Sequence, residues 1–263
     1  MLRGQIGQDF SNYSNQPIAP QPNSTSFEIN IPTPVKFKED WEKNRAVTIP
    51  NLLPDLQALN VWDYYFNQPD NWWDLIVHPD PDFDYNQSRV DNPNYYHMYN
   101  SPPGDPTLEY RVNHAHNVNN QGGFSYYYRR TNNQHPYLQI FQSPRFVQFL
   151  EFITGYNNLI ANVDRTFTSN YGPGHYNGPH TDGANGRIAF VYHLSKDWLP
   201  GYGGLFMRMD WDYKTVNKTL SPPFNTLAIF DTSGGDQGGS PHLVSEIAQG
   251  CNNKRISYTG WYE

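Results

Sequence analysis

The sequence of 263 residues contains a single cysteine, Cys251, so no disulfide can form within the chain and a disulfide-stapled scaffold is excluded. Charged residues make up only 16% of the chain, the net charge is −7, and no segment is rich in lysine and arginine. This balance argues against a nucleic-acid partner, because phosphate backbones are bound by clusters of basic side chains. No apolar run is long enough to cross a bilayer, and the N-terminal segment lacks the apolar core of a signal peptide. We therefore expect a cytoplasmic protein with no membrane partner.

Aromatic residues, proline and glycine are abundant instead, with 16% Phe, Trp and Tyr, 22 prolines and 20 glycines. After Leu159, β-branched and aromatic runs alternate with Gly, Pro, Asn or Asp, which is typical of short strands joined by turns. We expect strands at about 160–171, 186–195, 204–210, 225–231, 241–248 and 254–262. Six or more strands with no helix between them predict a mainly β fold with supporting helices, either a β-sandwich or a jelly roll.

The first part of the chain is expected to support this β core. Residues 1–35 are rich in Asn, Pro, Gln and Ser, which is typical of an extended or disordered arm. A short strand within 46–53 should lead into a helix that starts near Pro54. The apolar stripe expected for that helix is Leu56, Leu59, Trp62 and Phe66.

A second helix is expected over "SPRFVQFLEFITG", with Ser143 as its N-cap, Pro144 in its first turn and Gly155 as its stop. Its buried stripe would be Phe146, Phe149, Leu150 and Ile153. Residues 70–122 are irregular but aromatic, which favours a lid or a substrate wall. "FSYYYRR" (124–130) reads as a further strand. We expect a single domain over 36–263, with helical support and lid segments at 36–158 and the β core at 159–263.

The spacing His-x-Asp occurs twice, as His78-Pro79-Asp80 and as His180-Thr181-Asp182. In a chain with nine histidines, either copy alone is a weak signal. The first copy lies in a proline-broken acidic turn, where a solvated loop is the favoured interpretation. The second copy precedes the strand-forming run "RIAFVYHLS". Because residues i and i+2 of an extended segment point the same way, His180 and Asp182 could bind one metal ion together.

A third ligand is available in His242, at the head of a later expected strand. Two histidines and one carboxylate form the facial triad of non-haem Fe(II) oxygenases, which leaves coordination positions open for substrates. Arg255 and Ser257 share one face of the last expected strand, where a guanidinium and a hydroxyl can bind a carboxylate. Taken alone, Arg255 would be read as a salt-bridged strand residue. Its position after the three candidate ligands favours the carboxylate site.

The remaining histidines suit a metal site less well. His114 and His116 also lie two apart, but they stand among Asn and Gly with no strand run after them. We interpret both as polar surface residues. His97, His135 and His175 are expected to be ordinary loop histidines.

The sequence "YGPGHYNGPHTD", followed by "GRIAFVYHLSKDWLPGYGGLFMRM", "FDTS", "PHLVSEI" and "RISYTGWY", resembles the 2-oxoglutarate/Fe(II) dioxygenases. Within them it looks most like the prolyl hydroxylase branch. The resemblance covers about 159–262, and the helix ending "EFITG" is also similar to that branch. It implies a double-stranded β-helix, which is a jelly-roll or cupin-like core, with supporting helices packed on one sheet.

The resemblance also implies roles for individual residues. The Fe(II) ligands would be His180, Asp182 and His242. Arg255 would bind the distal carboxylate of 2-oxoglutarate, and Tyr171 would hydrogen-bond the same co-substrate. Arg187 falls where the family carries an arginine at the substrate mouth, and Tyr176 is also expected to contact the substrate.

The implied activity is hydroxylation of a prolyl residue in a peptide or protein, which uses Fe(II), 2-oxoglutarate and O2 and releases succinate and CO2. Ascorbate is a candidate reductant. The alternative substrate is a free amino acid or another small molecule. An alternative from a different class is a non-catalytic jelly-roll binding module, but that class gives no reason for the three candidate ligands and Arg255 to converge.

One position departs from the pattern of the resemblance. Relatives often carry a tyrosine where this chain has His193. That histidine would either hydrogen-bond the co-substrate in place of the tyrosine or simply fill the core, and the sequence leaves both open.

Overall fold

The computed structural model describes residues 34–78, 126–182, 185–211, 214–233, 239 and 241–263. The expected arm at 1–33 and most of the expected lid segment, including Asp80, His97, His114 and His116, lie outside the described residues. Their expected roles stay predictions.

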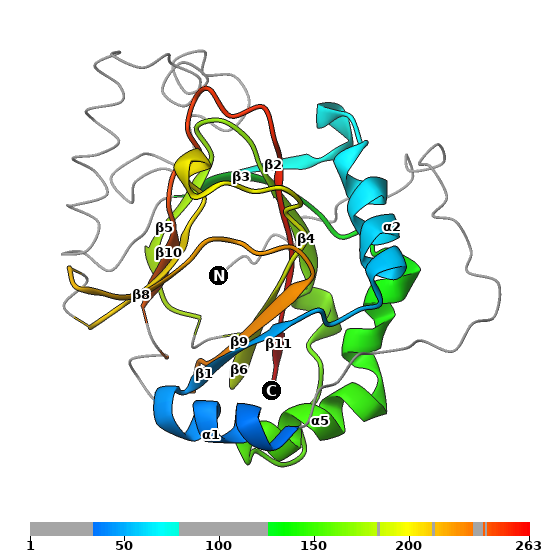
Figure 1. Ribbon diagram of the computed structural model, residues 1–263, viewed down its shortest axis with the longest axis vertical. Coiled ribbons are helices and arrows are strands. Elements are labelled where there is room, and N and C mark those ends of the chain that lie inside the picture. The colour runs from blue at the N-terminus through cyan, green and yellow to red at the C-terminus, as the bar shows by residue number, and fades with distance from the viewer. Residues whose placement is uncertain (1–33, 79–125, 183–184, 212–213, 234–238, 240) are drawn as a thin grey trace, which may run out of the picture.

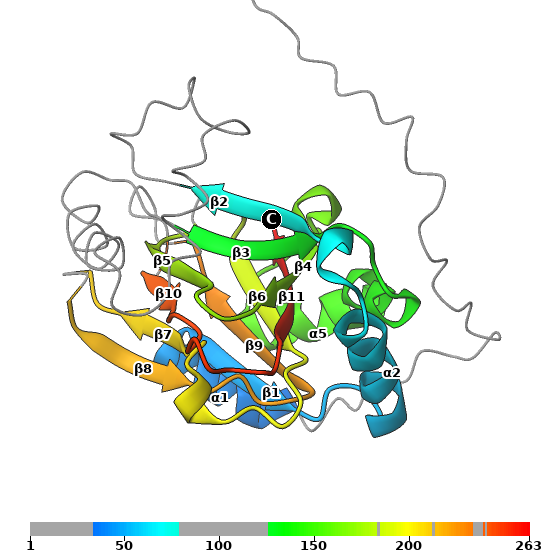
Figure 2. The same cartoon turned by 90° about the horizontal axis from the view of Figure 1, so that it is seen from above.

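The described strands form one antiparallel sheet of eleven strands, in the order β1-β9-β6-β11-β4-β3-β5-β10-β7-β8, with β2 paired to β3. The strands are β1 (Ala46–Pro50), β2 (Asp74–His78), β3 (Tyr126–Thr131), β4 (Phe167–Tyr171), β5 (Tyr176–His180), β6 (Ile188–His193), β7 (Phe206–Met209), β8 (Val216–Leu220), β9 (Thr226–Asp231), β10 (His242–Val244) and β11 (Arg255–Tyr262). The sheet curls on itself, so that β5, β10 and β7 lie across from β6, β11 and β9 (Figures 1 and 2). This architecture confirms the predicted jelly-roll fold.

Helices cover one outer face of the curled sheet (Figure 1). They are α1 (Pro34–Asn44), α2 (Asp55–Phe66) and α5 (Pro144–Thr154). The described residues also form the short 3-10 helices η1 (Asp70–Trp72), η2 (Pro136–Gln142), η3 (Val163–Arg165) and η4 (Pro200–Tyr202). In the described part of the chain, no helix has both the length and the apolar character that a membrane span requires.

Strand β11 contributes side chains to both faces of the sheet. Alternate residues Ile256, Tyr258 and Tyr262 join the hydrophobic core under the helices. The residues between them, Arg255, Ser257, Thr259 and Trp261, line the hollow inside the curled sheet. Because successive strand residues point to opposite faces, the period of two builds the core and places polar groups inside at the same time.

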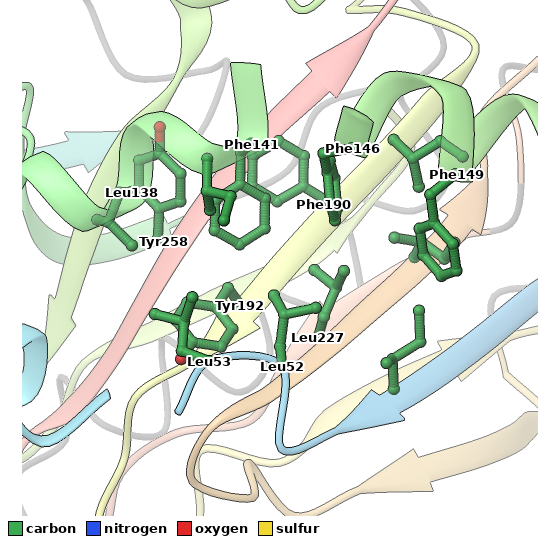
Figure 3. Packing of buried hydrophobic residues seen from close by; sticks show 14 of the residues in the cluster. Leu52, Leu53, Leu138, Phe141, Phe146, Phe149, Phe190, Tyr192, Leu227 and Tyr258 are labelled. Atoms are coloured by element: carbon green, nitrogen blue, oxygen red, sulfur yellow. The ribbon is translucent and has the colours of Figure 1, made fainter. Parts of the chain in front are cut away.

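The core between helices and sheet is dominated by aromatic side chains (Figure 3). Phe141 of η2 stacks on Phe190 of β6, with ring centroids 4.8 Å apart and planes 6° apart. The hydroxyl of Tyr262 donates a hydrogen bond to the carbonyl of Phe141, which ties the last strand to η2. Full burial of a side chain such as Phe141 stabilises the fold by about 1.5–3 kcal/mol.

Helix α5 forms as its sequence predicts. The side chain of Ser143 accepts a hydrogen bond from the backbone N–H of Phe146 at 3.3 Å, and Gly155 ends the helix in the left-handed conformation with φ of 71°. The buried face is the predicted stripe of Phe146, Phe149, Leu150 and Ile153. The predicted N-cap, buried face and terminating glycine of this helix are confirmed.

Helix α1 was not expected from the sequence, and the expected buried stripe of α2 is wrong in part. Helix α1 begins at Pro34, so the expected arm over 1–35 overlaps its first two residues. Helix α2 buries Ala58, Val61 and Tyr65, whereas Leu56 of the expected stripe is 71% exposed. The helix carries apolar residues on more than one face, and the contact of Tyr65 with the backbone of Asn133 and His135 selects the face that is buried.

Three strands were not expected from the sequence. Strand β2 lies in the segment expected to be irregular, and His78 belongs to this strand rather than to a solvated loop. Strand β5 contains Gly178 and Pro179, and β8 is a polar edge strand, so neither shows a β-branched or aromatic run. For β5 and β8, pairing with neighbouring strands rather than their own propensity makes these segments strands.

His135 and His175 lie outside the strands, as expected, but both side chains are buried. The Nδ1 atom of His135 accepts from the backbone N–H of Tyr137 at 3.3 Å, and Nδ1 of His175 accepts from that of Gly172 at 3.0 Å. Burial lowers the pKa of each imidazole to about 4. Both rings are therefore neutral in the folded protein at neutral pH.

These two pKa values predict how stability depends on pH. Between pH 6.5 and about 4 the unfolded chain binds protons at these histidines that the folded chain does not. The free energy of unfolding should be level above the unfolded pKa and should fall as the pH drops through this window. Urea unfolding across that range measures it, and His175→Asn should make the decline shallower. An unchanged decline in that variant would contradict the assignment.

Candidate metal centre and co-substrate pocket

A pocket of about 190 Å³ lies inside the curled sheet. Its lining comes from both arms of the sheet, with β5, β10 and β7 on one side and β4, β6, β9 and β11 on the other. The polar and charged side chains of the lining include His180, Asp182, His242, Arg255, Ser257 and Ser169.

Three side chains at one end of the pocket form a compact cluster. His180 ends β5, His242 begins β10, and the two residues are direct partners in the antiparallel register. The carboxylate of Asp182 lies between them, with Oδ2 3.3 Å from Nε2 of His242 and Oδ1 3.7 Å from Nε2 of His180. One ligand atom from each of the three residues falls within 4.8 Å of the others, so the cluster could hold one metal ion. The His-x-Asp spacing predicted that His180 and Asp182 lie together. The pairing of β10 with β5 brings His242 to the same place.

The protonation states also suit a metal ion. The Nδ1 atom of His180 lies 2.8 Å from the carbonyl oxygen of Gly178, which orients the ring so that Nε2 faces the carboxylate. Burial and the nearby His242 lower the pKa of His180 to about 4. Burial disfavours the charged form of Asp182, but His242 and His180 outweigh it and hold the pKa of that carboxyl at about 2. Neutral imidazole and ionised carboxylate are the forms that bind a metal.

Arg255 occupies the deep end of the pocket and is 1% exposed. Its Nε donates to the carbonyl of Gly204 at 2.7 Å, its Nη1 donates to Oγ of Ser257 at 3.3 Å, and its guanidinium lies 5.0 Å from the ring centre of Tyr171. Its Nη2 is buried and has no hydrogen-bond partner. Burial lowers the pKa of Arg255 only to about 10, so the group stays charged at neutral pH.

No carboxylate of the described residues forms an ion pair with Arg255. A buried cation with an unsatisfied N–H is costly unless an anion pairs with it. The orphaned Nη2 therefore fits an anionic group bound in this pocket, as the distal carboxylate of 2-oxoglutarate would be. The predicted shared strand face of Arg255 and Ser257 is present in the structure.

Gly204 makes the position of Arg255 possible. Its φ is +62°, and a Cβ built on it would lie 2.7 Å from Cδ of Arg255 and 2.5 Å from Cδ1 of Ile247. Gly204→Ala is therefore expected to displace the guanidinium and weaken co-substrate binding by roughly tenfold or more, because a shift of about 1 Å in a bound geometry is enough to do so. Isothermal titration with 2-oxoglutarate measures the effect, and Gly250→Ala, where a Cβ meets nothing, is the control. Equal affinity in both variants would contradict this account.

Two predicted substrate-binding residues are not brought to the pocket. The guanidinium of Arg187 donates to the main-chain carbonyls of Asn157 and Glu263, at 3.0 and 3.1 Å, and lies over the ring of Tyr156. It secures the end of the chain on the outer surface instead of lining the substrate mouth. Tyr176 is the first residue of β5 and is also absent from the pocket lining, to which its neighbour Asn177 contributes.

Strand β3 supplies pocket residues that the sequence analysis did not identify. Tyr126, Tyr128 and Arg130 line the pocket. Tyr128 stacks on Tyr171, with ring centroids 5.0 Å apart and planes 12° apart, and Arg130 lies over the ring of Phe167 at 5.5 Å. The alternate spacing within "FSYYYRR" was the available signal, because residues two apart on a strand share a face.

Comparison with known proteins places this geometry in a class. Residues 166–263 match the family model of the 2OG-Fe(II) oxygenase superfamily, and this segment contains all three cluster residues and Arg255. Residues 166–263 thus carry a 2OG-Fe(II) oxygenase domain, as the resemblance implied. No curated protein matches the chain at a significant level.

Among solved structures, one supports the fold at low sequence identity. A 2OG-Fe(II) oxygenase family oxidoreductase from Burkholderia pseudomallei is 13% identical, covers 90% of this chain and 93% of its own, and superposes with a TM-score of 0.54. A prolyl-4-hydroxylase from Pseudomonas putida is 14% identical, with coverages of 88% and 98% and a TM-score of 0.48. A Trichoplax adhaerens prolyl hydroxylase, solved with a hypoxia inducible factor peptide fragment, is 13% identical, with coverages of 87% and 88% and a TM-score of 0.45.

Proposed function

We propose that this protein is an Fe(II)- and 2-oxoglutarate-dependent oxygenase that hydroxylates a prolyl residue of a peptide or protein. The observation that carries the proposal is the convergence, in one buried pocket, of the His180, Asp182 and His242 cluster with the unpaired guanidinium of Arg255. A non-catalytic jelly roll would not explain the cluster or the unpaired guanidinium, because burying polar and charged groups costs free energy.

Each inner side chain has a role in the proposal. The metal ligands would be His180, Asp182 and His242. Arg255, with Ser257 and Tyr171 beside it, would bind the distal carboxylate of 2-oxoglutarate. When bound, the metal and co-substrate supply the oxidation: 2-oxoglutarate loses CO2 and becomes succinate with one oxygen atom of O2, and the other atom enters a C–H bond of the substrate.

The walls of the pocket orient the substrate and exclude water. Tyr126, Tyr128, Phe167 and Trp261 line the same pocket as the cluster, so a substrate bound there would contact aromatic surface. Aromatic faces suit the flat, apolar side of a pyrrolidine ring. Together with the similarity of "PHTD…YHLSKDW" to the prolyl hydroxylase branch, this supports a prolyl substrate.

One observation favours a second candidate substrate. The guanidinium of Arg130 lies on the same wall and could pair with the carboxylate of a free amino acid or another small acid. This candidate changes the substrate and leaves the reaction unchanged.

The test is turnover of 2-oxoglutarate to succinate with Fe(II) and ascorbate present. Panels of prolyl peptides, of the same peptides with alanine in place of proline, and of free amino acids are compared, and a gain of one oxygen atom is followed by mass spectrometry. The proposal predicts substrate-stimulated succinate and oxidised product for prolyl peptides alone. Stimulation by free amino acids, lost in Arg130→Ala, would support the second candidate. No turnover with any panel, together with no 2-oxoglutarate binding, would rule out both.

A further inference from the structure

A second hollow, of about 310 Å³, adjoins the pocket described above. The two hollows have four lining residues in common, Arg130, Phe167, Asn185 and Trp261. The second hollow is further lined by Asn132, Asp164 and Arg165. None of the candidate metal ligands lines it, and neither do the candidate co-substrate residues Arg255, Tyr171, Ser257 and His193. Metal and co-substrate binding therefore leave this hollow without a role.

A peptide substrate would extend beyond the first pocket. That pocket has a volume of about 190 Å³ and must hold the co-substrate and the reacting proline together. An extended chain spans at most about 3.3–3.6 Å per residue, so residues within two positions of the proline lie within roughly 7 Å of it. Since the two hollows share part of their lining, the second one lies close enough to receive a side chain next to the proline.

Arg130 stands between the two hollows and has no acidic partner there. It is half-buried, and its guanidinium lies 5.5 Å from the ring centre of Phe167. No carboxylate of the residues that the structure describes forms an ion pair with it, although Asp74 is its direct partner in the pairing of β2 with β3. A guanidinium in such a place can hold a carboxylate of a ligand through two parallel hydrogen bonds.

Arg165 adds a second positive charge to the same hollow. It is exposed, and its Nη1 donates a hydrogen bond to Oδ1 of Asn185, a residue of both linings. This contact keeps the guanidinium near the boundary with the first pocket. Among the described lining residues the one acidic side chain is Asp164, which is exposed. The lining thus has a net positive charge, in a chain whose net charge is −7.

We propose that the second hollow binds a side chain next to the reacting proline, and that Arg130 and Arg165 select aspartate or glutamate at that position. The substrate class is thus an acidic prolyl peptide. This proposal rests on the proposed function, because a prolyl residue must occupy the first pocket for its neighbour to reach the hollow. Asp164 opposes the preference, so Asp164→Asn should strengthen the binding of an acidic peptide, by roughly twofold.

The first test uses the unaltered protein and needs no turnover. Fluorescent peptides that differ only beside the proline, with glutamate, glutamine or lysine there, are titrated with protein that carries Zn²⁺ and 2-oxoglutarate, and the Kd is measured by fluorescence anisotropy. The glutamate peptide should bind roughly threefold to tenfold more tightly than the glutamine peptide, and the lysine peptide should bind more weakly than either. The difference should shrink toward about 1 M salt, where the Debye length is only about 3 Å.

Charge variants test whether the hollow causes the preference. Arg130→Gln and Arg165→Gln should each weaken the binding of the glutamate peptide by roughly threefold or more, and Arg130→Glu should reverse the preference in favour of lysine. Arg129→Gln is the matched control, because Arg129 pairs with Asp70 at 3.1 Å and lines neither hollow. Its peptide preference should equal that of the parent. If a variant fails to fold, the first test still decides the matter.

Succinate formation separates this proposal from the proposed function. If prolyl peptides are hydroxylated but the glutamate, glutamine and lysine peptides bind equally, the proposal is overturned and the proposed function stands. The same conclusion follows if the preference for glutamate persists undiminished in both arginine-to-glutamine variants. If no prolyl peptide binds or is hydroxylated, both fall.

Discussion

Replacing His180 with alanine is expected to raise the Kd for Fe(II) by more than roughly a hundredfold and to leave the fold intact. Changes to residues that merely support a metal ligand cost about 10–100-fold in affinity, so loss of a ligand should cost more. The fold should persist because His180 lies at the end of β5, where its backbone pairing with His242 does not depend on the imidazole. Anaerobic Fe(II) titration and thermal unfolding of parent and variant measure the two quantities.

A matched control is Asp164→Ala. Asp164 is an exposed carboxylate that lines a neighbouring hollow outside the three-residue cluster. Its removal should change neither the Fe(II) affinity nor the melting temperature. If His180→Ala bound Fe(II) as tightly as the control does, the cluster would not be the metal site.

Replacing Arg255 with methionine is expected to weaken 2-oxoglutarate binding strongly while the Fe(II) affinity stays the same. Truncating one partner of a buried charge pair costs about 2–5 kcal/mol or more, which is roughly 30-fold to several thousandfold in Kd. The melting temperature should hold or rise, because an unpaired buried charge is replaced by an apolar chain of similar length. Isothermal titration with 2-oxoglutarate and thermal unfolding test both parts.

Two further arginine variants sharpen this prediction. Arg255→Lys keeps the charge but loses the fork geometry, so its affinity should lie between those of the parent and the methionine variant. Arg187→Gln should leave 2-oxoglutarate affinity unchanged, because Arg187 binds main-chain carbonyls away from the pocket. If Arg187→Gln lost as much 2-oxoglutarate affinity as Arg255→Met, the effect of Arg255→Met would have to be attributed to a general disturbance of the fold.

The sequence predicted which inner side chains lie close together because strand geometry is regular. The i, i+2 spacing brings His180 next to Asp182, and the same period puts Arg255 and Ser257 on one face. What the spacing could not give is that β10 pairs with β5, which sets His242 opposite His180. The register between strands that are distant in the sequence depends on how the whole sheet packs, so no short segment of sequence predicts it.

The misplaced residues, one expected from the resemblance and one from the local pattern, are positioned by tertiary contacts. Arg187 precedes β6, but its backbone N–H pairs with the carbonyl of Tyr262, and this pairing directs the side chain to the outer surface. Leu56 is exposed because α2 has apolar residues on several sides and only the side with Val61 and Tyr65 meets the core. The pocket residues of β3 were missed although their alternate spacing is visible, because the stacking of Tyr128 on Tyr171 of β4 is a long-range contact.

The most direct test of the central claim is an anaerobic optical titration of the metal-free protein with Fe(II) and 2-oxoglutarate. The account predicts a weak visible charge-transfer band that needs both components and is absent in His180→Ala and Arg255→Met. Such a band would show that the cluster and Arg255 act on one chelate in one pocket. No band, together with no tight Fe(II) binding by the parent protein, would contradict the account.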